Sequence, residues 1–197
     1  IKRYGYEWAE LWLIATFPSR HYDIDDYPSI KQYLLSYGFE RLEQTGKVHI
    51  VNGEKVKARK KTNNKWFETQ DSISYWEDFN KPKIMYSEIV REPQFFFDVD
   101  GKFYPEATSF IMTGDGLETL YRVFHTSLAT YLFKRFYAGG GLGEKGYRYK
   151  KAFFEDLPIP KALLHQQIDE LSANESLIRL YGLSSEEVSF IESQQNL

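Results

Sequence analysis

Residues 117–136 have the sequence LETLYRVFHTSLATYLFKRF, which carries the strongest structural signal in the chain. Apolar side chains recur there at steps of three and four residues, and they are Leu117, Leu120, Tyr121, Phe124, Leu128, Tyr131, Leu132 and Phe136. That spacing places them on one face of an α-helix. The segment therefore predicts one long amphipathic helix that ends at Gly139.

Short apolar segments before this helix predict a small sheet. They lie at residues 83–89, 94–99 and 108–112, and Asp100-Gly101 supplies the turn after the second. The expected fold class is α+β (mixed α/β), with a small twisted, mostly antiparallel sheet packed by the long helix.

A β-hairpin is expected earlier in the chain, at residues 48–51 and 54–58. The two segments flank Asn52-Gly53, the dipeptide best suited to the two positive φ angles of a type I′ turn. Nearer the N-terminus, Trp12–Thr16 is short and apolar and predicts a buried strand, and residues 28–44 predict a helix.

Beyond Pro158-Ile159-Pro160 the chain is expected to be helical, at residues 161–180 and 184–194, with a capping box from Ser184 to Glu187. This tail is acidic, and we expect it to be peripheral. The predicted division is a main domain at 1–161 and an acidic helical C-terminal extension at 162–197.

Composition narrows the class of protein. The 197 residues include 25 Lys and Arg against 28 Asp and Glu, with 42% hydrophobic and 17% aromatic residues, which is too rich for intrinsic disorder. Cys 0 excludes disulfides and thiolate metal sites, and no apolar run approaches the roughly 20 residues that span a bilayer. We expect a soluble, cytoplasmic protein, and because the chain starts with Ile1 we expect a fragment of a longer one.

Positive charge is concentrated in one short stretch. Residues 55–65 contain six basic residues and no acidic one, whereas the other 186 residues hold 19 basic and 28 acidic residues. A second basic concentration runs from Lys134 to Lys151. A basic arm on an acidic body favours a partner that is a polyanion. A solvated loop explains the charge about equally well.

The segment 59–65 has no apolar anchor, so we expect a mobile or ligand-ordered loop. Aromatic residues adjoin both basic stretches. Trp66 follows the first, and Tyr147 and Tyr149 alternate with basic residues in the second, an interleaving that nucleic-acid surfaces use. A strand with one face in the core accounts for the alternation equally well.

Catalytic patterns are weak. Asp98, Asp100 and Lys102 resemble the acid, acid-x-Lys spacing of metal-dependent nucleases, but a turn at Asp100-Gly101 explains them better. The four histidines lack metal-ligand spacing, and the glycines at 139–143 lack the strand-to-helix setting of a phosphate-binding loop. We expect no catalytic residue and no metal site.

Five segments occur in an order that matches a known family. They are Ile1-Lys2-Arg3-Tyr4, Lys65-Trp66-Phe67-Glu68, Lys81-Pro82-Lys83-Ile84, the helix at 121–133, and Phe154-Glu155-Asp156-Leu157-Pro158-Ile159-Pro160. Together they resemble the TaqI-like C-terminal specificity (target-recognition) domain of adenine-specific DNA methyltransferases and type IIG restriction-modification enzymes. The chain departs from the family at 124–127, where Phe-His-Thr-Ser stands in place of a Leu-Asn-Ser run.

The resemblance implies sequence-specific recognition of double-stranded DNA. The parent enzyme would transfer a methyl group from S-adenosylmethionine to adenine, and Mg²⁺ would be needed if the parent also cleaves DNA. This chain has no Asn-Pro-Pro-Tyr motif and no glycine-rich methyl-donor motif, so neither cofactor is expected in the fragment. The implied partners are double-stranded DNA and the methyltransferase domain of the same parent chain, with no membrane.

Candidate contacts follow from side-chain chemistry. Lysines bind phosphates without selecting sequence, whereas Arg, Asn and Gln form paired hydrogen bonds with base edges. The phosphate candidates are Lys55, Lys57, Lys60, Lys61, Lys65, Lys145 and Lys150. The base-reading candidates are Arg59, Asn63, Asn64 and Arg148, with aromatic support from Trp66, Tyr147 and Tyr149.

Three alternatives stay open. The Pro-Ile-Pro ending also occurs in specificity subunits of type I restriction systems, which would make the chain a module of that kind. The second alternative is a metal-dependent nuclease built on Asp98, Asp100 and Lys102. The third is a protein-interaction module that binds a partner through its acidic tail, residues 163–197.

Overall fold

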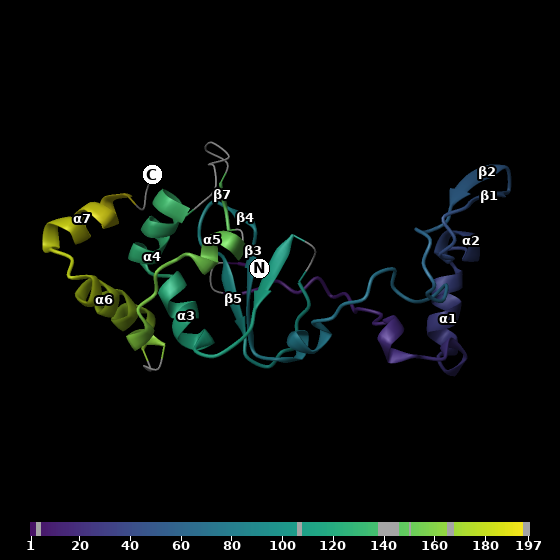
Figure 1. The fold of residues 1–197 in the computed structure, drawn as a ribbon, viewed down its shortest axis with the longest axis horizontal. Helices are drawn as coiled ribbons and strands as arrows, with labels where there is room; N and C mark the ends of the chain where they lie inside the picture. Colours follow the sequence, from purple (N-terminus) through teal and green to yellow (C-terminus); the bar gives the residue numbers. More distant parts are fainter. Residues whose placement is uncertain (3–4, 106–107, 138–145, 150, 165–167, 195–197) are drawn as a thin grey trace. The chain divides into compact units, whose positions relative to one another are not determined.

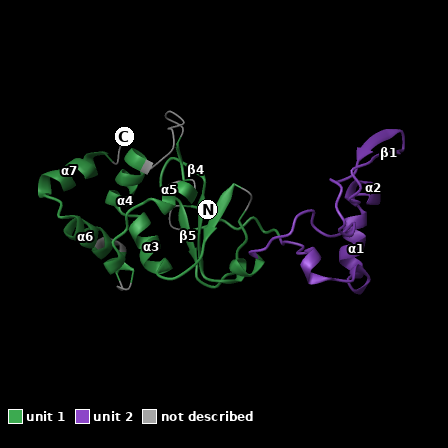
Figure 2. Ribbon diagram, in the orientation of Figure 1, with its two compact units in different colours: residues 1–11, 76–197 green, residues 12–75 purple. Residues whose placement is uncertain are grey.

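The chain forms two compact units in a computed structural model, which describes residues 1–2, 5–105, 108–137, 146–149, 151–164 and 168–194. Unit 1 comprises residues 1–11 and 76–197, and unit 2 comprises residues 12–75 (Figure 2). Helices and short antiparallel strands together make an α+β fold, as predicted (Figure 1). In the described part of the chain, no helix has the length and apolar character needed to cross a bilayer.

The centre of unit 1 is a three-stranded antiparallel sheet in the order β5-β3-β6. Its strands are β3 (Lys83–Ser87), β5 (Phe95–Asp98) and β6 (Ser109–Met112). The register places Met85 of the central strand opposite Phe96 and Ile111. A second pair joins β4 (Ile89–Val90) to β7 (Tyr147–Arg148), and the 3₁₀ segment η3 (Trp76–Asn80) precedes the sheet. The three strands predicted from the sequence are thus confirmed.

The predicted long helix is two helices. α3 (Leu117–Phe124) and α4 (Ser127–Leu132) are separated at His125-Thr126, and the π-helical segment η4 (Phe133–Tyr137) follows. Thr126 has an extended backbone, with φ −70° and ψ 153°, and its hydroxyl accepts a hydrogen bond from the Ala129 N–H at 3.2 Å. The break occurs because this hydroxyl starts a new helix. Gly139, the predicted end, lies outside the described residues.

The apolar stripe predicted for this segment is confirmed in part. Leu117, Phe124 and Leu128 are buried, but Phe136 is 66% exposed, and Val123 and Phe133 are buried although the pattern did not include them. One core combines the sheet residues Ile84, Tyr86 and Phe95 with Leu117, Phe124 and Phe133 of the helical segments. The short helix α5 (Lys151–Glu155) adds Phe154 to the same cluster.

The C-terminal helices are part of unit 1. They are α6 (Glu170–Tyr181) and α7 (Ser185–Ser193), after the 3₁₀ segment η6 (Lys161–Leu163), and the capping box from Ser184 to Glu187 is present. Leu163, Leu177 and Ile191 are buried against the α3–α4 region in a second core. α6 and α7 lie at the outer edge of unit 1, beyond α3 and α4 (Figure 1), and their apolar side chains complete a core there. The compact units divide the chain elsewhere than the predicted boundary near residue 161.

Unit 2 contains two 3₁₀ segments, two helices and a hairpin. These elements are η1 (Pro18–Arg20), η2 (Ile24–Asp26), α1 (Pro28–Leu35), α2 (Phe39–Leu42), β1 (Val48–Val51) and β2 (Glu54–Lys57). The hairpin matches the prediction, with φ of 51° at Asn52 and 84° at Gly53. The predicted helix at 28–44 is interrupted at Gly38, whose φ of 91° is incompatible with a helix.

The strand predicted at residues 12–16 does not form. Trp12 is 84% exposed, and the backbone there is irregular. An apolar pentapeptide does not form a strand by itself, because a strand also needs a neighbouring strand to pair with its backbone N–H and C=O groups.

Candidate nucleic-acid interface

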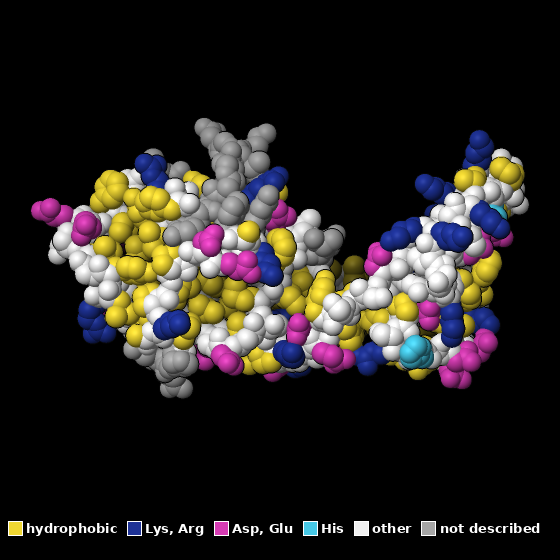
Figure 3. All heavy atoms as spheres, in the orientation of Figure 1, with side chains coloured by type: hydrophobic (Ala, Val, Ile, Leu, Met, Phe, Trp, Pro, Cys, Tyr) yellow, Lys and Arg dark blue, Asp and Glu magenta, His cyan; other side chains and the backbone are white. Residues whose placement is uncertain are grey.

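Exposed lysines are concentrated on the hairpin of unit 2 and on the segment that follows it. Lys55 and Lys57 lie on β2, and Lys60, Lys61 and Lys65 lie beyond it; all five side chains are exposed. Figure 3 shows Lys and Arg side chains gathered over the part of unit 2 that carries β1 and β2, with hydrophobic side chains among them. The sequence-predicted phosphate candidates of the first basic stretch thus share one region.

Arg59 has a different role from its neighbours. Its Nε donates to the carbonyl oxygen of Leu42 at 2.6 Å, its Nη1 to that of Glu68 at 3.0 Å, and its Nη2 to that of Trp66. Partial burial lowers the pKa of this guanidinium below its usual value, and the group stays a cation. Arg59 therefore links the backbone at Leu42 to the backbone at residues 66–68, and the predicted base-reading role does not fit its position.

Gln44 organises the same region from inside. Its buried side-chain amide donates to the carbonyl oxygens of Lys65 at 2.9 Å and Glu68 at 2.8 Å, and its Oε1 accepts from the Thr62 hydroxyl at 2.6 Å. Asn64, another base-reading candidate, donates from Nδ2 to the carbonyl oxygens of Thr69 and Gln70. Its amide N–H groups are therefore engaged with the backbone.

The expected mobile loop at 59–65 is thus an ordered frame. Side-chain to backbone hydrogen bonds anchor it in place of apolar contacts, and they hold its lysines at defined positions. The carboxylate of Glu68 adds one more, by accepting from the Lys65 N–H at 2.7 Å. A cluster of exposed lysines held in this way suits an anionic partner.

Asn63, Lys60 and Lys65 of this stretch are exposed. Asn63 therefore remains a candidate for contact with a base. Lys60 pairs with Asp71 at 2.9 Å, and Lys65 reaches the Tyr22 carbonyl oxygen at 3.3 Å and lies 5.5 Å from the Phe67 ring centre. Trp66 is half-buried and packs on Phe39, with ring centres 5.9 Å apart.

The second basic stretch lies in unit 1 and is described only in part. Lys145 and Lys150 lie outside the described residues. Tyr147 and Arg148 are half-buried on β7, and the Lys134 ammonium lies 5.0 Å from the Tyr147 ring centre. Tyr149 is 3% exposed and stacks on Phe133 at 4.0 Å. Tyr149 is therefore a core residue, which is the alternative that the sequence left open, and cannot support a ligand at the surface.

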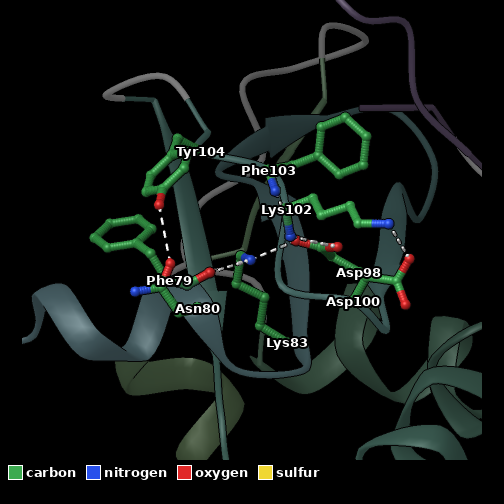
Figure 4. A network of polar contacts seen from close by, with 8 residues as sticks. All are labelled: Phe79, Asn80, Lys83, Asp98, Asp100, Lys102, Phe103 and Tyr104. Carbon is green, nitrogen blue, oxygen red and sulfur yellow. Dashed lines mark hydrogen bonds and ion pairs between the residues drawn. The ribbon is translucent and has the colours of Figure 1, made fainter. Parts of the chain in front are cut away.

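Asp98, one residue of the nuclease alternative, belongs to a buried ion pair (Figure 4). Lys83 and Asp98 are almost fully buried and form an ion pair, and Lys83 also donates to the Phe79 carbonyl oxygen at 2.7 Å. Asp98 accepts further hydrogen bonds from the backbone N–H groups of Lys102 at 3.1 Å and Phe103 at 2.9 Å. With its oxygens engaged in this way, Asp98 is a structural residue.

The other two residues of that alternative form a separate pair at the surface. Lys102 donates to Asp100 at 2.7 Å, and both side chains are mostly exposed. Gly101 between them has φ 66°, and a Cβ there would lie 2.4 Å from the Asn80 carbonyl oxygen, so the turn requires glycine. Within the described ranges, no group of three His, Asp or Glu side chains is placed to hold a metal ion. The turn interpretation thus accounts for the motif better than a nuclease site.

Compared with known proteins, the chain matches no protein-family model and no curated sequence. The interface is therefore assigned from its own residues.

Sequence reasoning missed two groups of residues at this interface. Val48 and Ile50 are 58% and 66% exposed on the hairpin, beside the lysines. The alternation of β1 could have found them, since Val48 and Ile50 share a face with Lys55 and Lys57 once the turn sets the register. Gln44 gave no signal, because its role depends on backbone carbonyls that lie more than 20 residues away.

Proposed function

We propose that the chain is a target-recognition domain that binds double-stranded DNA in a sequence-specific manner, as part of a restriction-modification adenine methyltransferase. The observation that carries the proposal is the exposed lysine surface of unit 2, held on a frame that Arg59 and Gln44 fix. Duplex DNA carries one negative charge per roughly 1.7 Å of its axis, and such a surface is complementary to it.

The division of labour in such an enzyme has a physical reason. Methylating a base requires turning it out of the duplex, and a second domain must hold the DNA and read the site meanwhile. S-Adenosylmethionine, and Mg²⁺ if the parent cleaves DNA, would belong to other domains of the parent chain. A cytoplasmic location goes with this proposal, because the substrate is the cell's DNA.

The type I specificity-subunit alternative uses the same chemistry of DNA recognition. The protein-interaction alternative has less support, because Leu163, Leu177 and Ile191 of the tail are buried within unit 1. The nuclease alternative is not favoured, since Asp98 is engaged with Lys83.

Binding to a pool of random duplex DNA, measured by fluorescence anisotropy at several salt concentrations, tests the proposal. Each phosphate contact contributes about 0.9 to the slope of log K against log salt. The Lys57→Ala/Lys61→Ala variant should weaken binding to all duplexes and lower that slope by about 1 to 2. Sequencing of the bound fraction should show a short enriched motif.

The matched control is Lys102→Ala/Lys161→Ala, which removes two exposed lysines from unit 1, outside both basic stretches. Its slope should equal that of the unaltered chain. Absence of salt-dependent binding, or equal slopes for both double variants, would contradict the proposal.

A further inference from the structure

The outward face of the β1–β2 hairpin combines two aliphatic side chains with two lysines. The antiparallel register pairs Val48 with Lys57 and Ile50 with Lys55. Residues two apart on a strand share a face, so these four side chains lie together. All four are exposed, and Ile50 is the most exposed of the aliphatic pair at 66%.

The opposite face holds the hairpin against the rest of unit 2. His49 contacts the Glu43 carboxylate, and Val56, opposite His49, is half-buried. The Ala58 N–H donates to the Lys47 carbonyl oxygen at 2.9 Å, and the Gly46 N–H donates to that of Arg59 at 2.8 Å. These contacts attach the base of the hairpin to unit 2 and leave its outward face in contact with solvent.

This face suits a partner that is anionic and also offers small apolar groups. Acidic side chains are absent from the four outward positions, and the only acid of the two strands, Glu54, pairs with Val51 on the other face. The major groove of DNA has phosphates along both edges, and the 5-methyl groups of thymine line its floor. Two strands about 4.8 Å apart fit a groove about 12 Å wide.

We propose that the β1–β2 hairpin enters the major groove of DNA, where Val48 and Ile50 contact thymine methyl groups and Lys55 and Lys57 contact phosphates or guanine. This inference rests on the proposed function and adds the reading element and the class of base that it reads. Double-stranded RNA is a poor ligand for such a face, because its major groove is too narrow and uracil has no methyl group.

Replacing thymidine by deoxyuridine removes the methyl group and leaves every hydrogen-bonding group of the base pair in place. The probe is the duplex most enriched from the random pool, prepared with thymidine and with deoxyuridine at each thymine position in turn. The unaltered chain should bind at least one deoxyuridine duplex about fourfold more weakly, the value of one buried methyl group.

Ile50→Ala and Val48→Ala should each weaken binding to the thymidine duplex. Each variant should also bind the thymidine and deoxyuridine duplexes equally well at one of the thymine positions. Val99→Ala is the matched control, because Val99 is 60% exposed in unit 1, and it should discriminate like the unaltered chain. Circular dichroism checks that the variants fold.

The outcomes separate the two proposals. Motif-specific binding without any thymidine preference, and unchanged by Val48→Ala and Ile50→Ala, overturns the hairpin inference and leaves the proposed function standing. Absence of salt-dependent DNA binding overturns the proposed function. Self-association in sedimentation that Ile50→Ala abolishes, without an effect on DNA binding, would assign the face to a second copy of the chain and overturn the inference as well.

Discussion

Arg59 shows how one side chain in a basic run can differ in role from its neighbours. Three backbone carbonyl oxygens surround its guanidinium, whereas Lys60 is exposed and contacts Asp71. We expect Arg59→Ala to destabilise unit 2 by about 2–4 kcal/mol, because hydrogen bonds to a charged donor contribute about 1.5–3 kcal/mol each and are not additive. Hydrogen exchange of the β1 and β2 amides measures the loss.

Lys60→Ala is the control for that experiment. It removes the same charge from the adjacent position, and the amide protection of the hairpin should stay unchanged. Equal effects of the two substitutions would show that Arg59 has no special structural role.

We expect the buried ion pair of Lys83 and Asp98 to contribute to the stability of unit 1. Asp98→Ala leaves the Lys83 ammonium buried without its counter-ion and removes the acceptor for two backbone N–H groups. We expect a loss of about 3–5 kcal/mol in the free energy of unfolding, measured by urea denaturation. Asp100→Ala is the matched control, and it should change the midpoint little, because its partner Lys102 is exposed. A midpoint shift as small for Asp98→Ala as for the control would contradict the structural role.

The buried Tyr86 hydroxyl should make the free energy of unfolding fall at alkaline pH. Burial, with a smaller effect of the nearby Glu155 carboxylate, raises its pKa to about 12. The unfolded chain releases this proton near pH 10 and the folded chain retains it, so the free energy of unfolding falls as pH rises from about 10 to 12. Tyr86→Phe should flatten this fall in urea unfolding measured at pH 8 to 11.5. A steeper fall in the variant would contradict the assignment.

At the scale of elements, the break between α3 and α4 shows a local hydrogen bond overriding an amphipathic pattern. The Thr126 hydroxyl also donates to the Val123 carbonyl oxygen at 2.7 Å, so it serves the end of one helix and the start of the next. The two helices contribute mainly to different cores, because Leu117 and Phe124 of α3 lie in the first core whereas Leu128 and Ala129 of α4 lie in the second.

Thr126→Ala should cost about 1 kcal/mol of stability through the lost cap. Thr126→Ser keeps the hydroxyl and should retain most of that stability. Thermal unfolding of the two variants measures the difference, and equal losses would assign the effect to the methyl group.

The hairpin shows the opposite relation between sequence and structure. Asn52-Gly53 specifies its turn and therefore its register, and the register decides which residues share the outward face. The dipeptide thus determines that Val48 and Ile50 share a face with Lys55 and Lys57, whereas the contacts of the opposite face with the rest of unit 2 decide that this face points to solvent.

At the scale of the whole molecule, the two units differ in how much apolar surface they bury. Among the described residues, eighteen buried hydrophobic residues belong to unit 1 and four to unit 2. The four are Phe17, Ile24, Ala58 and Phe67. Unit 2 depends more on polar side chains such as Gln44 and Arg59 for its order.

We expect unit 2 to open more readily than unit 1, because hydrophobic burial is the dominant favourable contribution to folding. Native-state hydrogen exchange should give lower protection for the amides of β1 and β2 than for those of β3 and β5. Equal protection in both sheets would show that the chain unfolds as a single cooperative unit.

The sequence by itself determined the α+β class, the three strands of the unit 1 sheet, the hairpin and the capped C-terminal helix. These follow from interactions between residues close in the chain, such as alternation, turn dipeptides and caps. The tertiary structure alone decided that Arg59 and Asn64 are engaged with backbone, that Tyr149 is buried, and that the C-terminal helices complete a core. Those outcomes depend on carbonyl groups and apolar surfaces that lie elsewhere in the fold, because a side chain's role is set by the partner that folding brings to it.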